Sequence, residues 1–140
     1  MNFTMQYAGP KFLAELIAGS GLKINGMYVE YSTKEKAAGV RSHEYFRDLK
    51  NAKSAGYGRV AITLSYVDDS NTVHFDALVN KQDLTGSVPA RAKYVCATLV
   101  HMQDSNPEND VLLWTVSFTD PVPVTNSEYT TIHTSMKLGA

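Results

Sequence analysis

Hydrophobic and polar residues alternate along two neighbouring stretches in the middle of the chain. The apolar positions are Val60, Ile62, Leu64 and Tyr66 in the first stretch, and Val73, Phe75, Ala77 and Val79 in the second. A period of two is typical of a β-strand with one buried face. Between the stretches, residues 68–71 are Asp-Asp-Ser-Asn, whose short side chains hydrogen-bond locally and tolerate unusual backbone angles. We therefore predict a β-hairpin over residues 59–79.

Three further strand segments are predicted in the C-terminal half. Residues 93–102 and 111–118 are apolar at both alternating sets of positions, which is typical of strands buried on both faces. We expect the second of these strands to end at residues 120–123, Asp-Pro-Val-Pro, because proline cannot donate to a ladder. Residues 128–138 alternate again. Their expected buried face consists of Ile132, Thr134, Met136 and Leu138.

The N-terminal half contains a predicted helix, a predicted strand and an ambiguous segment. Residues 9–19 have a proline where a first helical turn tolerates it, an apolar stripe at helical spacing and a closing glycine. Residues 24–31 are rich in β-branched and aromatic side chains and predict a strand. Residues 42–50 fit either a short helix or an irregular excursion, and we favour the helix. The glycines at 56 and 58 indicate a loop before the hairpin.

These elements predict a mainly β fold, an antiparallel β-sandwich of about six strands with a short N-terminal helix and a second short helix at 42–50. An open barrel is the alternative. We expect one domain over residues 1–140, because we find no internal repeat or linker. Residues 1–8 form a possible docking arm, since Phe3, Met5 and Tyr7 alternate before any domain element begins. Such a segment can pair with an edge strand of this chain or of a neighbour.

Composition and charge exclude several classes of partner. The chain has 14 acidic and 13 basic side chains and no basic stripe, so we expect no contact with nucleic acid. The N-terminus does not resemble a secretion signal and no apolar stretch is long enough to span a bilayer as a helix, so we expect no membrane partner. Cys96 is the only cysteine, which suits a reducing cytoplasm and predicts a small buried side chain.

Catalytic and ligand-binding motifs are not found in the sequence. It has no nucleotide-binding glycine loop, no paired-histidine zinc signature and no nucleophile elbow. His74 and Asp76 share one strand face and can hold a metal ion if another segment contributes, but a solvated polar face opposite Phe75 is the favoured interpretation. Asp68 and Asp69 suit a weak calcium site, but a hairpin turn is the favoured interpretation, because the sequence lacks the spaced ligands of a dedicated calcium loop. We predict no catalytic residue, no cofactor and no metal.

The tyrosines, eight in number, suggest sugar binding as a further option. Exposed aromatic rings on one sheet or loop set would favour it. Because Tyr66 and Tyr94 lie within strand patterns, we expect both at the core or its edge.

Four stretches together resemble a family of small structural proteins of tailed bacteriophages, found in tails, baseplates and fibre-attachment complexes. They are the opening helix running into Gly-Leu-Lys-Ile-Asn-Gly-Met-Tyr-Val-Glu-Tyr at 21–31, Glu-Tyr-Phe-Arg-Asp-Leu at 44–49, Gly-Arg-Val-Ala at 58–61, and the closing order of buried strand, Pro-Val-Pro and Thr-rich strand. The stretches cover most of the chain, but each is short and none is a catalytic signature.

The resemblance implies a β-sandwich component of the virion tail, assembled in the host cytoplasm, whose partners are other virion proteins and copies of itself. An adaptor or baseplate piece is favoured over a fibre, because the sequence has no collagen-like or coiled-coil shaft. The candidate interface residues are Phe3, Met5 and Tyr7 in the arm, and Tyr45, Phe46 and Tyr57 in the irregular region. For the second group, local packing is an equally good interpretation.

Two other functions remain open from the sequence. A carbohydrate- or small-ligand-binding module predicts clustered exposed aromatics. A small hydrolase or isomerase predicts titratable side chains that converge in a cleft. A virion component predicts extensive apolar contact with other chains.

Overall fold

A computed structural model describes residues 2–5, 23–126 and 128–137. Their strands form one antiparallel sheet of seven strands in the order β1-β6-β5-β2-β3-β4-β7. The strands are β1 (Asn2–Met5), β2 (Gly26–Ser32), β3 (Ala55–Val67), β4 (Thr72–Val79), β5 (Lys93–His101), β6 (Val111–Pro123) and β7 (Thr130–Lys137). One α-helix, α2 (His43–Lys50), and two short 3₁₀ helices, η1 (Lys81–Asp83) and η2 (Pro107–Asn109), complete the described elements. The prediction of a mainly β, antiparallel fold is confirmed.

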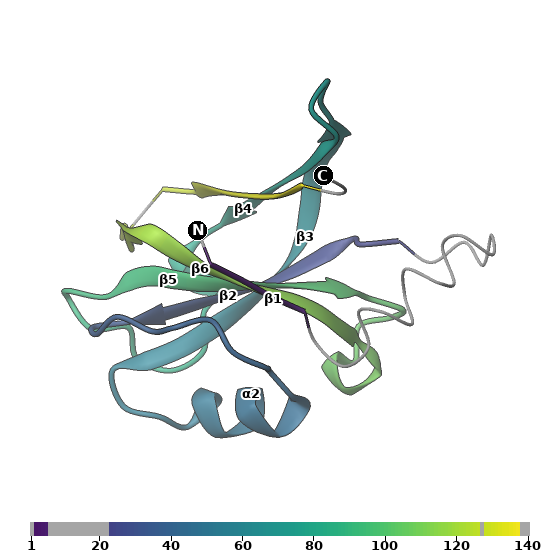
Figure 1. The fold of residues 1–140 in the computed structure, drawn as a ribbon. Coiled ribbons are helices and arrows are strands. Elements are labelled where there is room, and N and C mark those ends of the chain that lie inside the picture. Colours follow the sequence, from purple (N-terminus) through teal and green to yellow (C-terminus); the bar gives the residue numbers. More distant parts are fainter. Residues whose placement is uncertain (1, 6–22, 127, 138–140) are drawn as a thin grey trace.

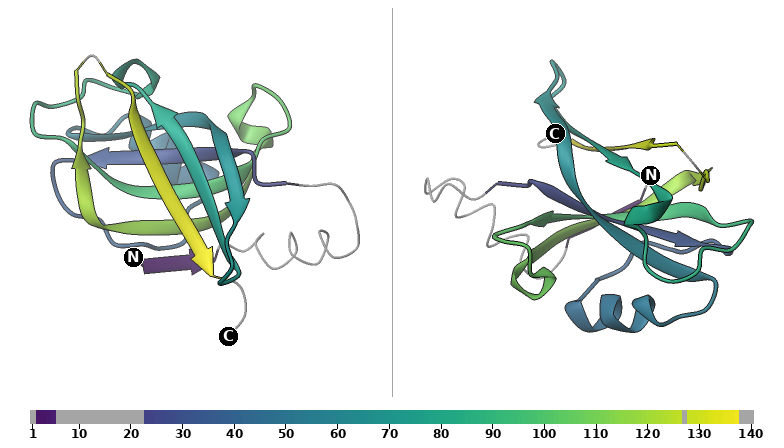
Figure 2. Two further views of the ribbon diagram at one scale, coloured as in Figure 1. Left: turned by 90° about the horizontal axis from the view of Figure 1, so that it is seen from above. Right: turned by 180° about the vertical axis from the view of Figure 1, so that it is seen from behind.

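The sheet is continuous because β3, a strand of 13 residues, pairs with a different strand along each half of its length. The first half of β3, from Ala55 to Ala61, pairs with β2. The second half, from Ile62 to Val67, pairs with β4, which in turn pairs with β7. The β4–β7 part therefore curls over β2, β5 and β6, and the sheet becomes nearly barrel-shaped (Figures 1 and 2). The prediction of a sandwich of two separate sheets is not confirmed, since the strand pairing runs through β3 without a break.

The concave face of this curled sheet encloses the main core. Its buried members come from strands on both sides of the curl, namely Met27, Val29, Tyr31, Val60, Phe75, Ala77, Val79, Tyr94, Leu99, Leu113, Trp114, Ile132 and Met136. The strands predicted from alternation in β4 and β7 thus place their apolar faces inward, as expected. Cys96 is fully buried, which confirms the expectation for the single cysteine.

The opposite face of the sheet is covered by α2 (Figure 1). This helix begins after Ser42, whose Oγ accepts a hydrogen bond from the Tyr45 backbone N–H at 3.1 Å. Phe46 and Leu49 point from α2 to the sheet, where Phe46 packs edge-on against Tyr28 with ring centroids 4.7 Å apart. All seven residues of β2 are buried because both faces of this strand are covered. The helix favoured for residues 42–50 is therefore confirmed.

Two strands extend beyond their predicted limits. The segment expected to be a loop around Gly56 and Gly58 lies inside β3, where both glycines pair with β2. A Cβ at Gly58 would approach the Asp83 carbonyl to 3.0 Å, so the close passage of the chain, and not a turn, accounts for this glycine. Strand β6 continues to Pro123 although it was expected to stop at Asp120. The prolines are tolerated because β1 pairs only with residues 114–117, so this end of β6 lies at an edge.

The N-terminal arm pairs with its own chain. Residues 2–5 form β1 at the edge of the sheet, with Phe3 opposite Val116 and Met5 opposite Trp114. Of the two pairings expected for this segment, the structure shows the one within the chain. Tyr7 and the helix predicted for residues 9–19 lie outside the described residues.

Candidate functional site

The β3–β4 hairpin rises above the rest of the curled sheet (Figures 1 and 2). Its turn is stabilised by Asp68, whose Oδ1 accepts hydrogen bonds from the backbone N–H groups of Ser70 at 2.9 Å and Thr72 at 3.1 Å. Asn71 adopts a positive φ of 60°, a conformation that asparagine tolerates. The hairpin and the chemistry of its turn are both as predicted.

A β-bulge turns large apolar side chains of this hairpin outward. The pairing with β4 shifts between Ile62 and Leu64, so that Thr63 is an extra residue on β3. Because side chains alternate with a period of two, one extra residue moves every following side chain to the other face. Leu64 and Tyr66 are therefore 52% and 45% exposed, and the prediction that they face the core is wrong. Val67, next to the turn, is 65% exposed.

The same outward face carries a chain of four polar side chains. Nε2 of His74 donates to Oδ2 of Asp68 at 2.7 Å, and a hydrogen bond of 3.1 Å joins Nδ1 of His74 to Nε2 of His133. Nδ1 of His133 then donates to Oδ1 of Asp76 at 2.5 Å. The ring of Tyr66 stacks on His74 with centroids 4.6 Å apart. Sequence alone could not join these groups, because His74 and His133 are 59 positions apart.

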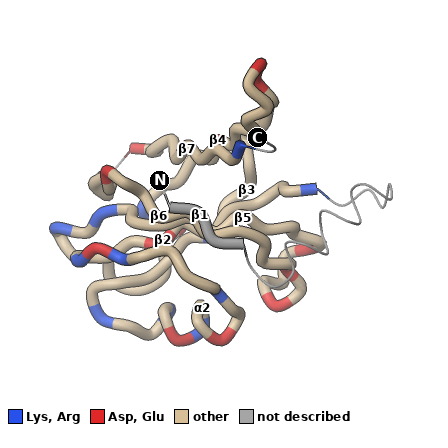
Figure 3. The backbone as a smooth tube through the Cα atoms, in the orientation of Figure 1, with Lys and Arg blue, Asp and Glu red and all other residues tan. Residues whose placement is uncertain are grey.

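Asp68 has the most perturbed carboxyl group of this face. Its hydrogen bond from His74 comes first, followed by bonds from Ser70 and from the Thr72 backbone, and together they hold the pKa of Asp68 well below its usual range. The Asp68 carboxylate in the hairpin turn therefore stays ionised across the ordinary pH range. Acidic residues also mark the tip of this hairpin in Figure 3.

Beneath the sheet, a buried carboxylate on β2 is neutralised by the loop that leads to α2. Glu30 accepts from Nε of Arg41 at 3.0 Å and from the Tyr45 hydroxyl at 2.7 Å. The Arg41 guanidinium lies 4.4 Å from the centre of the Tyr45 ring and 3.8 Å from the Cys96 sulfur. Burial raises the pKa of Tyr45, and the bond to Glu30 raises it further. This cluster fixes the 33–42 loop against the sheet.

A second buried carboxylate, Asp110, lies where β6 begins. Arg59 donates from Nε and Nη2 to its two oxygens, each at 2.7 Å, and the Tyr28 hydroxyl donates to the same carboxylate. Nε2 of His43 donates to the Asp110 carbonyl at 3.0 Å. Burial raises the pKa of Tyr28, and its hydrogen bond to Asp110 adds to the effect. Both buried clusters are satisfied internally, so their role is to hold elements together.

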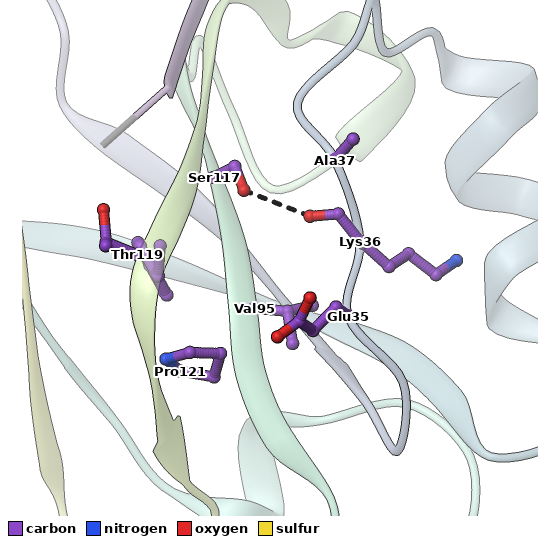
Figure 4. A pocket seen from close by; sticks show the side chains of 8 residues that line it. Glu35, Lys36, Ala37, Val95, Ser117, Thr119 and Pro121 are labelled. Atoms are coloured by element: carbon purple, nitrogen blue, oxygen red, sulfur yellow. Dashed lines mark hydrogen bonds between the residues drawn. The ribbon is translucent and has the colours of Figure 1, made fainter.

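Shallow pockets border the 33–37 loop. One, of about 420 Å³, lies between this loop and the strands β5 and β6, with Val95 and Ser117 on its walls (Figure 4). The Ser117 hydroxyl donates to the Lys36 carbonyl at 3.1 Å across one side of it. No nucleophile with an adjacent base lies among its lining residues, which are Glu35, Lys36, Ala37, Val95, Ser117, Phe118, Thr119 and Pro121.

Of the interface residues proposed from sequence, Tyr45, Phe46 and Tyr57 lie together in one aromatic cluster, with Phe46 4.9 Å from Tyr57 and 5.3 Å from Tyr45 between ring centroids. The Phe46 side chain is buried under the sheet, and Tyr57 stacks on Tyr28 with centroids 5.4 Å apart. Tyr45 is half-buried against Glu30. These three pack within the chain as the alternative interpretation expects, and their contact with another chain stays a prediction. The exposure of Leu64 and Tyr66 was missed because the bulge at Thr63 has no signal in the alternation of the sequence.

Among the residues that the structure describes, neither a cluster of metal ligands nor a membrane-spanning helix occurs. No three His, Cys, Asp or Glu side chains of this part of the chain are arranged to hold a metal ion together. None of its helices has the length and apolar character needed to cross a bilayer. No protein-family model, curated protein or solved structure matches the chain.

Proposed function

We propose that this chain is a structural component of a bacteriophage virion, in the tail, the baseplate or a fibre adaptor, and that it acts through contacts with other proteins. The observation that carries this proposal is the projecting β3–β4 hairpin. Leu64 and Tyr66 lie on its outward face, Val67 follows them next to the turn, and the three side chains are 52%, 45% and 65% exposed. Single exposed apolar residues are ordinary, but a group of them on a projecting element favours a protein contact.

The shape of the sheet supports the same proposal. Strand β7 is the last strand of the described sheet, so one side of its backbone is open to pairing with a strand from a neighbour. The hairpin can supply the apolar anchors that dominate the affinity of an interface. The resemblance to phage structural proteins indicates the kind of assembly that the chain would join. In this proposal, the β4–β7 part forms one layer and β2, β5 and β6 form the other, and together they correspond to the two layers of the sandwich that the resemblance implies.

The proposal is tested by mass spectrometry of intact particles from the source of the sequence. We expect the chain as a stoichiometric component, in a complex with other virion proteins or with copies of itself. A chain that is monomeric and not found in particles would overturn the virion function.

The hairpin is tested by a double variant, Leu64→Ser with Val67→Ser, against a matched control, Val40→Ser. Val40 is 66% exposed but lies in the loop before α2, away from the hairpin. Surface substitutions of this kind change the free energy of unfolding by within about 0.5 kcal/mol. We expect the double variant to fold normally and to be lost from particles, while the control is incorporated. Equal incorporation of both would exclude the hairpin as the docking element.

A carbohydrate- or small-ligand-binding module is the second candidate. It is favoured by the exposed rings of Tyr66 and Tyr129, since exposed aromatics are what such a module presents to a sugar. Glycan-array binding that is lost in Tyr66→Ala would support it over the virion function.

A further inference from the structure

The two ends of β3 carry side chains of opposite charge. At its C-terminal end, Val67 leads into the turn of the projecting hairpin, where Asp68 and Asp69 follow one another. At its N-terminal end, Ala55 borders a hollow that also carries lysines. Figure 3 shows acidic positions at the hairpin tip and basic positions in the loop that follows β2. The 13 residues of β3 measure about 40 Å along the strand, so the tip and the hollow of one chain lie far apart (Figure 1).

The hollow, of about 660 Å³, lies between the 33–37 loop and the 51–54 turn that follows α2. Two of its lysines, Lys34 and Lys53, are exposed. Within the described part of the chain, neither of their ammonium groups has a hydrogen bond or an ion pair. A third, Lys36, places its ammonium nitrogen 5.8 Å from the centre of the Tyr45 ring. We call this site the basic hollow.

Little of this positive charge is compensated from within. Arg41 also lines the basic hollow, but its charge is balanced by the buried Glu30. Glu35 is the single acidic side chain among the described residues that line it. Glu35 and Lys36 leave the loop in different directions (Figure 4). The basic hollow therefore keeps an excess of positive charge, which attracts a negatively charged group.

The walls of the basic hollow are joined to each other and to its floor. The Thr33 N–H donates to the Ser54 carbonyl at 3.2 Å, which connects the loop to the turn after α2. Nη2 of Arg41 donates to the Ala37 carbonyl at 3.2 Å. A site whose shape is formed beforehand loses less conformational entropy when it binds.

The hairpin tip has the charge and the shape to enter such a hollow. Asp69 is exposed, and in the described part of the chain its carboxylate has no partner, whereas Asp68 is bonded to His74. Val67, next to the turn, is exposed as well. We propose that the tip of one chain docks into the basic hollow of a second copy, with Asp69 on the lysines and Val67 against the alanines that line it.

This contact joins two different surfaces, so each added copy leaves one tip and one basic hollow free. Repetition of such a head-to-tail contact builds a ring if the rotation closes and an open chain if it does not. The inference rests on the proposed function for the role of the hairpin as a docking element, and it names the partner as a copy of this chain. Because a hairpin tip buries little surface, we expect reversible association.

Sedimentation velocity of the full chain over a range of concentrations tests the inference. We expect oligomers larger than a dimer, and their loss in about 1 M salt, where charges are screened beyond about 3 Å. Asp69→Lys and Lys53→Glu should each leave a monomer, because like charges then face each other. An equal mixture of the two variants should restore the oligomers. The reversed tip of the first fits the reversed hollow of the second, and the unchanged tip of the second fits the unchanged hollow of the first.

Two variants at exposed positions on other elements, Asp120→Lys and Lys23→Glu, make the same changes in net charge and serve as controls. Both should associate like the parent chain. Restoration by mixing also shows that the two test variants are folded. It separates the head-to-tail contact from a symmetric contact between two hairpins, which mixing would not restore.

Three results would overturn the inference: a parent chain that stays monomeric at every concentration, a mixture that stays monomeric, or equal loss of association in the controls. Its failure is distinct from failure of the proposed function. If Leu64→Ser with Val67→Ser is lost from particles while the mixture stays monomeric, the hairpin docks on a different virion protein, and only this inference is wrong. Restored oligomers of a chain that is not found in particles would support the contact and overturn the virion function.

Discussion

Arg59 holds Asp110 through two parallel hydrogen bonds, from Nε and Nη2, each 2.7 Å long. The two residues are 51 positions apart, on β3 and at the start of β6. The Asp110 side chain has no exposed surface, whereas that of Arg59 is 21% exposed. The pair therefore connects the middle of the sheet to the 102–110 loop through a buried charge.

Asp110→Asn is expected to lower the free energy of unfolding by about 3 kcal/mol, because removing one partner of a buried ion pair leaves the other charge uncompensated. Urea unfolding of the two proteins measures the difference. The matched control is Arg47→Gln, which breaks the exposed pair between Arg47 and Glu108. We expect little change there, since solvent screens exposed pairs. Equal effects in the two variants would show that burial does not decide the strength of these pairs.

Glu30→Gln is expected to destabilise the fold by about 3–5 kcal/mol, since the Arg41 guanidinium then loses its carboxylate in a buried setting. The double variant Glu30→Leu with Arg41→Met removes both charges and should recover most of that loss. Chemical denaturation of the single and double variants provides the comparison. If the double variant is less stable than Glu30→Gln, the ion pair contributes net stability and the expected recovery is wrong.

Cys96 is expected to resist thiol reagents in the folded protein at pH 8. Burial raises the pKa of its thiol to about 11, with Glu30 adding to the effect and Arg41 opposing it. The reactive thiolate is therefore scarce, and the sulfur is inaccessible as well. The rate of reaction with a disulfide reagent, with and without urea, checks this. Fast labelling of the folded chain would contradict the buried position.

Stability is expected to fall as the pH rises from about 9 to 12. Burial raises the pKa of Tyr94 to about 12, and that of Cys96 to about 11. Groups whose pKa is higher in the folded state favour folding below their unfolded pKa, and this contribution is lost as pH passes the folded value. Tyrosinate absorbance and circular dichroism, recorded together in an alkaline titration, measure the loss. Ionisation of all tyrosines near pH 10 in the folded chain would disagree with the structure.

Ser42→Ala is expected to cost about 1 kcal/mol, because it removes the side-chain acceptor at the start of α2. The loss should appear first as faster amide hydrogen exchange within α2, which covers Tyr28 on the sheet. Ser42→Asp, which keeps an acceptor at this position, serves as the control and should preserve the protection. Unchanged exchange in the alanine variant would mean that packing of Phe46 and Leu49 alone fixes the helix.

Local patterns determined most of the strands. The alternation in 73–79 and 128–138 identified β4 and β7 together with their buried faces, since a period of two depends only on neighbouring residues. The doubly apolar runs identified β5 and the first part of β6. The Asp-Asp-Ser-Asn sequence predicted the turn of the hairpin, because Asx side chains form such turns by local hydrogen bonds.

Tertiary structure decided the features that depend on pairing between distant segments. The extra residue Thr63 turned Leu64 and Tyr66 outward, and only the register with β4 reveals it. The shared strand β3 made one curled sheet where alternation alone allowed two. The pairing of β4 with β7 brought His133 against His74, 59 positions away, because a sequence specifies which face of a strand is polar but not which strand lies beside it.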